Sequence, residues 1–155
     1  MAAFVLIAGV GGHAAYWNRL IPQLETRGHR AVAADLEEDD PSMDLDGFAA
    51  AVQAAMGDYA DVIAVAQSLG GFIAPMIRKP VRMIVLLNAM IPRSGESPNE
   101  WWGNTGSGSA RRDADLADGR DPTSIGIPAR PSRRREGAML EPARRLPVGD
   151  AVNIR

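Results

Sequence analysis

Short apolar runs alternate with longer amphipathic segments over residues 1–90. The runs are rich in Val, Ile, Leu and Ala, and they lie at residues 4–8, 30–34, 61–66 and 81–87. Runs of this kind are typical of strands that are buried on both faces. Segments with helical spacing of apolar residues lie between them, at residues 17–24, 46–56 and 69–79. The alternation predicts an α/β fold, a parallel sheet flanked by helices and joined by right-handed crossovers.

The first helical segment contains an interruption. Its apolar side chains, from Trp17 to Leu24, follow at spacings of three and four residues, and Gly28 stands where a helix commonly ends. Pro22 lies inside the segment. Because proline lacks an N–H and clashes within a helix, Pro22 argues against an unbroken helix here.

The pattern weakens after Asn88. Short helices are expected around Trp101-Trp102 and over residues 110–117, and the acidic residues 37–41 are expected to form a solvated loop. Residues 122–155 contain five of the eleven prolines, runs of arginine and only scattered apolar side chains. This composition favours disorder. We expect a domain over residues 1–121 and a disordered, arginine- and proline-rich tail over residues 122–155.

Composition excludes several kinds of site. The chain has no cysteine and two histidines, so disulfides and thiolate or histidine-rich metal sites are not expected. A formal net charge of −2 gives no general attraction to nucleic acid or to membranes. Residues 1–8 resemble a first strand more than a signal peptide, and no apolar run approaches the ~20 residues that span a bilayer. We expect a cytoplasmic protein with no cofactor, no metal and no nucleic-acid or membrane partner.

The chemistry concentrates at residues 66–70, Ala-Gln-Ser-Leu-Gly, between the third strand and the next helix. A Gly-x-Ser-x-Gly segment in this context forms a nucleophile elbow, a sharp turn that exposes a serine above the sheet. Ala66 replaces the first glycine but is still small, and Gly70 and Gly71 supply the other side. Ser68 is therefore the predicted nucleophile, with a helix N-cap as the alternative role.

Backbone N–H groups near Ser68 are candidates for an oxyanion hole. Leu69 N–H stands at the start of the helix, and Val10 N–H lies in the glycine-rich loop after the first strand. The glycines of that loop allow the backbone to approach a substrate closely. Further residues are expected to line the site without a catalytic role, namely Gly9, Gly11, His13 and Asn88.

These residues resemble the N-terminal half of α/β-hydrolase-fold proteins. The resemblance covers about residues 3–121 and is strongest to bacterial esterase-like relatives of plant methylesterases and hydroxynitrile lyases. It rests on residues 4–9, 16–17, 28–29, 65–72 and 87–92 and on the strand that ends at Asp35. It implies hydrolysis of a small-molecule ester through an acyl-Ser68 intermediate, with Val10 and Leu69 as oxyanion donors.

The rest of a catalytic triad is not where the resemblance places it. The family carries its acid and its histidine after the serine, but both His13 and His29 precede Ser68. His13 lies near the oxyanion loop, and His29 is expected to be structural. Asn88 occupies a position where some members carry the acid, and Ala8 stands where plant members often carry a histidine. The expectation is a partial, possibly inactive hydrolase, and we interpret the tail as the product of a truncated or frame-shifted gene.

The missing half has a structural consequence. In the family's strand order the fourth strand is internal, whereas here its outer edge has no predicted partner. An unpaired strand edge is a site of dimerisation or aggregation. Dimerisation through this exposed sheet edge is therefore expected.

Two other functions remain open from the sequence. Gly9-x-Gly11-x-x-Ala14 followed by Asp35 matches the fingerprint of a Rossmann-like NAD(P)-binding domain. The second alternative is a non-catalytic binding module on a hydrolase fold, with Trp101 and Trp102 lining an apolar pocket or, instead, covering the core.

Overall fold

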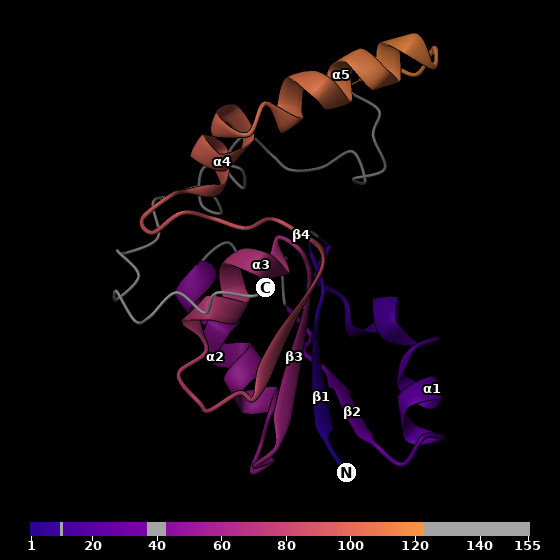
Figure 1. The fold of residues 1–155 in the computed structure, drawn as a ribbon, viewed down its shortest axis with the longest axis vertical. Coiled ribbons are helices and arrows are strands. Elements are labelled where there is room, and N and C mark those ends of the chain that lie inside the picture. The colour runs from indigo at the N-terminus through magenta and orange to yellow at the C-terminus, as the bar shows by residue number, and fades with distance from the viewer. Residues whose placement is uncertain (10, 37–42, 123–155) are drawn as a thin grey trace.

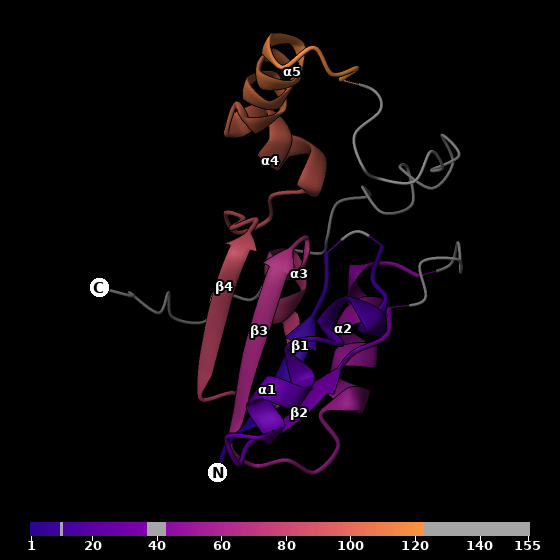
Figure 2. The same ribbon diagram turned by 90° about the vertical axis from the view of Figure 1, so that its right-hand side faces the viewer.

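A four-stranded parallel sheet forms the centre of the computed structural model, which describes residues 1–9, 11–36 and 43–122. The order of the strands is β2-β1-β3-β4, and all three neighbouring pairs are parallel. The strands are β1 (Ala3–Ile7), β2 (Arg30–Ala33), β3 (Val62–Ser68) and β4 (Met83–Ala89). Figures 1 and 2 show the sheet with the carboxyl ends of its strands directed toward the same edge. This confirms the parallel α/β fold.

Helices cover both faces of the sheet (Figure 1). One face carries the 3-10 helix η1 (Ala14–Trp17) and α1 (Ile21–Glu25), which pack on Leu6, Ile63 and Val65. The larger core lies on the other face, beneath α2 (Leu45–Ala55), α3 (Gly70–Ile73) and the 3-10 helix η2 (Ala74–Met76). Two further helices, α4 (Pro98–Asn104) and α5 (Ser107–Ala117), project beyond the carboxyl ends of the strands.

The helices follow the sequence pattern except where proline intervenes. The segment around Pro22 is broken as expected, with η1 ending at Trp17 and Pro22 in the first turn of α1. The prediction of one helix over residues 69–79 is wrong. The helical backbone ends at Met76 because Pro75 offers no N–H and Ile77 is extended. The acidic loop 37–41 and the predicted tail beyond Pro122 lie outside the described residues.

Two carboxylates stabilise the start of α4. Ser97 and Glu100 form a capping box, in which Glu100 accepts from the Ser97 N–H and hydroxyl at 2.8 and 2.7 Å. Glu96 accepts from Asn104 Nδ2 and from Arg93 N–H, both at 2.8 Å. The hydrogen bonds from Ser97 lower the pKa of Glu100, and those from Asn104 and Arg93 lower the pKa of Glu96.

We expect acid to loosen α4. A lowered folded-state pKa means that the stabilisation is complete above the ordinary value of 4.5 and is lost as the pH falls through the folded-state pKa. Carbon chemical shifts of residues 98–104 should therefore move toward coil values below about pH 4. The double variant Glu96→Gln, Glu100→Gln should show a weaker helix at neutral pH and no acid transition. Helical shifts that persist unchanged to pH 3 would contradict this assignment.

Candidate active site

Ser68 ends β3 in a left-handed backbone conformation, with φ of +51°, directly before α3. Among the described residues other than glycine, only Ser68 and Asn88 have positive φ. Such a conformation is strained for a residue with a side chain, and strain of this kind is concentrated at functional sites. The elbow is thus a property of the backbone and not only of the motif.

Small residues allow this turn to pack against the ends of β1 and β4. A Cβ on Gly70 would lie 3.0 Å from the Ile7 carbonyl oxygen. A Cβ on Gly71 would lie 1.9 Å from the Met90 carbonyl oxygen, which no side chain can occupy. Ala66, the substitute for the first glycine, is fully buried, so a larger side chain there would need space that the core does not offer.

A bulge in β4 lies beside the elbow. Gln67 pairs with Leu87 and Ser68 pairs with Ala89, so Asn88 is the extra residue. Met90 N–H then donates to the Ser68 carbonyl oxygen at 2.9 Å. Asn88 is exposed at the carboxyl edge of the sheet. It is placed where a site residue was expected, but its amide cannot act as a carboxylate.

The loop after β1 touches Ser68 directly. Gly9 N–H donates to Gln67 Oε1 at 3.0 Å, and a Cβ on Gly9 would lie 2.6 Å from Ser68 Cβ and 3.0 Å from Ser68 Oγ. Gly11, with φ of +94°, continues this loop, which the Gly12 N–H closes by donating to the Gly9 carbonyl oxygen at 3.0 Å. Val10, the predicted oxyanion donor, lies outside the described residues.

Leu69 is the N-cap residue of α3, and no side chain caps this helix. The alternative in which Ser68 is the capping residue is therefore not supported. The first N–H groups at a helix start have no partner within the helix. Leu69 N–H accordingly stands beside Ser68 in the position expected of an oxyanion donor.

The two histidines lie at opposite edges of the sheet. His13 is exposed and follows the loop after β1, at the same edge as Ser68. His29 precedes β2 at the other edge, where its Nδ1 accepts from Ala2 N–H at 3.4 Å and its ring packs edge-on against Phe4. Within the part of the chain that the structure describes, no histidine or carboxylate is hydrogen-bonded to Ser68 Oγ.

The geometry does not favour dinucleotide binding. That fold places its third strand beyond the second, in the order 3-2-1-4, whereas here β3 lies on the other side of β1. The glycine-rich loop leads into the four-residue η1 and not into a helix that could hold a pyrophosphate. Asp35 Oδ1 accepts from Ala14 N–H at 3.0 Å, so this carboxylate holds the loop end.

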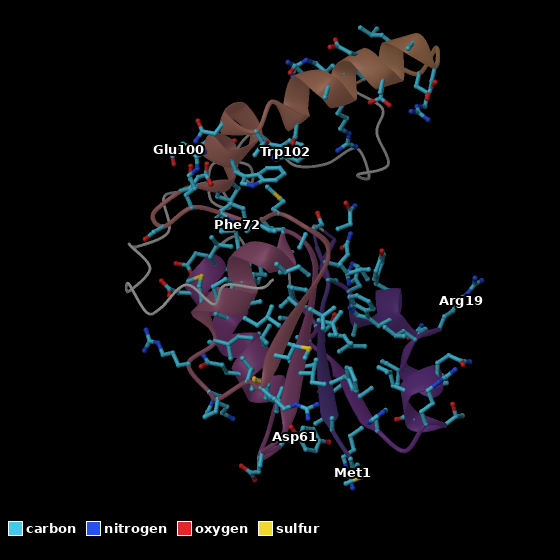
Figure 3. The ribbon with its side chains drawn as sticks, in the orientation of Figure 1. Met1, Arg19, Asp61, Phe72, Glu100 and Trp102 are labelled. Atoms are coloured by element: carbon cyan, nitrogen blue, oxygen red, sulfur yellow. The ribbon has the colours of Figure 1, made fainter. Side chains whose placement is uncertain are left out.

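Other candidate chemistry finds little support among the described residues. They contain no group of three potential metal ligands and no helix long and apolar enough to cross a membrane. Trp101 packs against the main core, and its Nε1 donates to the Ile91 carbonyl oxygen at 3.1 Å. Trp102, labelled in Figure 3, is more exposed. Trp101 therefore covers the core, as one of the two interpretations of this pair predicted.

Gln67 is a site residue that the motif did not identify. Replacing Gln67 by Leu should lower the free energy of unfolding by about 1 kcal/mol, because Gly9 N–H loses its acceptor. It should also lower the reactivity of Ser68, because the loop that touches this serine is no longer held. Gln67→Glu keeps the acceptor and should retain both properties. Urea unfolding and the rate of labelling by a fluorophosphonate measure the two effects.

Gln53 offers a matched control for Gln67. Its Oε1 accepts from Arg78 N–H at 2.8 Å, on α2 and away from the elbow. Gln53→Leu should therefore cost a similar amount of stability and leave the labelling of Ser68 unchanged. Equal effects of the two variants on labelling would show that Gln67 has no specific influence on Ser68.

Several solved structures share this fold. An extracellular α/β-hydrolase from a Paenibacillus species is 23% identical with a TM-score of 0.56, and the match covers 75% of this chain and 53% of that one. Polyneuridine aldehyde esterase is 22% identical with a TM-score of 0.59, covering 69% and 48%. A pyrethroid hydrolase from Sphingobium faniae JZ-2 is 24% identical with a TM-score of 0.54, covering 63% and 43%. The matched part of this chain corresponds to about half the length of these proteins.

No curated protein matches the chain in sequence. A family model described as the alpha/beta hydrolase family matches residues 4–152, which is most of the chain. This match agrees with the strand order and with the strained turn at Ser68. The chain belongs to the alpha/beta hydrolase family.

Proposed function

We propose that the chain hydrolyses small-molecule esters with Ser68 as the nucleophile. The observation that carries this proposal is the left-handed backbone of Ser68 between a buried strand and a helix. In the reaction, Ser68 Oγ attacks the ester carbonyl carbon and loses its proton, the alcohol leaves, and water then releases the acid from the acyl-serine. An esterase and a pyrethroid hydrolase among the structural neighbours support the choice of esters.

The oxyanion of the tetrahedral intermediate needs two donors near Ser68. Leu69 N–H supplies one, because it stands at the start of α3 next to the nucleophile. Val10 N–H is the second in this proposal, since Gly9, which precedes it, already touches Ser68. The hydrogen bond between Gly9 N–H and Gln67 holds this loop against the elbow.

The general base is the weak part of the site. His13 shares the edge of the sheet with Ser68, and no histidine follows Ser68 in the sequence. A serine without a base stays protonated, and triad enzymes that lose a member lose several orders of magnitude in rate. The proposal therefore includes slow acylation, limited by proton removal from Ser68 Oγ.

Hydrolysis of p-nitrophenyl acetate by the wild type and by Ser68→Ala tests the proposal. Imidazole, added as an external base, should raise the part of the rate that depends on Ser68 to at least about tenfold above the Ser68→Ala background. His13→Ala shows whether His13 contributes as a base. Equal rates for the wild type and Ser68→Ala, with and without imidazole, would remove the claim of serine catalysis.

A further inference from the structure

β4 presents apolar side chains to solvent along its whole length. Met83 is 53% exposed and Leu87 47%, while Val85 and Leu86 are 37% and 36% exposed. Figure 2 shows this strand at the open edge of the sheet, with β3 on its inner side. The register with β3 places Met83, Val85 and Leu87 on the face that carries α1, and Ile84 and Leu86 on the opposite face.

The outer edge of β4 also carries unpaired backbone groups. Arg82 N–H donates to the Val62 carbonyl oxygen at 2.8 Å, so Arg82 is bonded toward β3. Alternate residues of a parallel strand bond to the same neighbour, which turns the N–H and C=O groups of Met83, Val85 and Leu87 outward. Within the described ranges no strand pairs with them.

This edge lacks the features that usually protect a sheet edge. β4 reads Met-Ile-Val-Leu-Leu-Asn-Ala and contains no charged residue and no proline. Exposed edges commonly carry lysine, proline or short strands to prevent pairing. The other edge, β2, has only four residues, begins with the charged Arg30, and keeps its other three side chains half-buried. β4 is thus the edge with both the surface and the hydrogen-bonding groups for a partner.

We propose that β4 pairs antiparallel with β4 of a second copy of this chain, about a two-fold axis at Val85. A two-fold axis makes two identical strands run antiparallel. The outward groups of Val85 then pair with those of Val85 in the other copy, and Met83 pairs with Leu87. On the opposite face Ile84 meets Leu86, so every cross-strand pair at the centre is apolar.

The charges at the ends of the strand are compatible with this register. Arg82 of one copy faces the uncharged Asn88 of the other, so no like charges are opposed. Arg82 also remains neutralised by Asp61, whose carboxylate lies 3.2 Å from its guanidinium. An interface built on two seven-residue strands lies at the small end of protein interfaces, below about 1,200 Å² in total. The dimer should therefore be reversible at micromolar concentrations.

The absence of cysteine allows a direct test of the register. Val85→Cys should form a covalent dimer under mild oxidation, because paired residues of an antiparallel ladder lie about 5.5 Å apart, within disulfide range. Met83→Cys alone and Leu87→Cys alone should give at least tenfold less dimer, whereas a mixture of the two should cross-link. Equal cross-linking at the three positions, or none at Val85, overturns the proposal.

Sedimentation over a wide concentration range provides an independent test. The wild type should change reversibly from monomer to dimer, and Val85→Lys should remain monomeric. Leu116→Lys is the control, since Leu116 is 63% exposed on α5, away from β4. A monomer at all concentrations, as expected if another part of this chain or a different protein covers β4, overturns the proposal, as does a dimer that survives Val85→Lys. If Val85→Lys does not fold, the cysteine variants still decide.

Discussion

Gly71→Ala is expected to leave the chain unfolded. The added Cβ would lie 1.9 Å from the Met90 carbonyl oxygen and 2.9 Å from its carbonyl carbon, and both atoms belong to the backbone. Neither side can retreat, because Met90 N–H is bonded to the Ser68 carbonyl oxygen at 2.9 Å. Overpacking at a rigid site costs about 3 kcal/mol or more, against a stability of about 5–15 kcal/mol for ordinary domains and less for a small sheet. Circular dichroism during urea unfolding measures the loss.

Gly103→Ala is the matched control for this prediction. No heavy atom lies within 4 Å of the position that its Cβ would take, and Gly103 is part of α4. Alanine there should stabilise the chain by up to about 1 kcal/mol, because glycine is the weaker helix former. Equal urea midpoints for the two variants would show that the contact between Gly71 and Met90 is not as tight as described.

Gly9→Ala is expected to suppress the reactivity of Ser68 by about 100-fold. Its Cβ would lie 2.6 Å from Ser68 Cβ and 3.0 Å from Ser68 Oγ, so either the serine or the loop must move. A displacement of about 1 Å at a reacting group is enough for a loss of this size. The rate of labelling of Ser68 by a fluorophosphonate measures the effect.

Gly108→Ala separates this effect from general damage. Its Cβ would make only ordinary contacts, at 3.7 Å to Arg112 and 3.8 Å to Trp102, on α5. Labelling of Ser68 should therefore stay at the wild-type rate. If Gly9→Ala is labelled as fast as Gly108→Ala, the loop after β1 does not constrain Ser68.

The strands were predictable because each is a short apolar run, and burial on both faces requires such a run. The helix after Ser68 was predicted too long, because the apolar spacing continues past Pro75 although the backbone cannot. The sequence also indicated that Pro22 would break the preceding helical segment, which the structure bears out. Local propensity thus predicted the elements better than their ends.

The site was only partly predictable. The small residues around Ser68 revealed the turn, since a sharp turn between strand and helix needs them. The contact between Gly9 and Gln67 joins positions 58 residues apart and has no local signature beyond a polar side chain at the end of an apolar strand. The bulge at Asn88 likewise depends on the register of two strands, which single-strand patterns do not specify.

Mass-spectrometric location of a fluorophosphonate adduct on the intact chain tests the central claim most directly, because the probe reacts with an activated serine and marks the residue. The account predicts an adduct on Ser68 after prolonged incubation, faster with imidazole, and no adduct at this position in Ser68→Ala. An adduct on a different serine, or equal labelling of the wild type and Ser68→Ala, would contradict it.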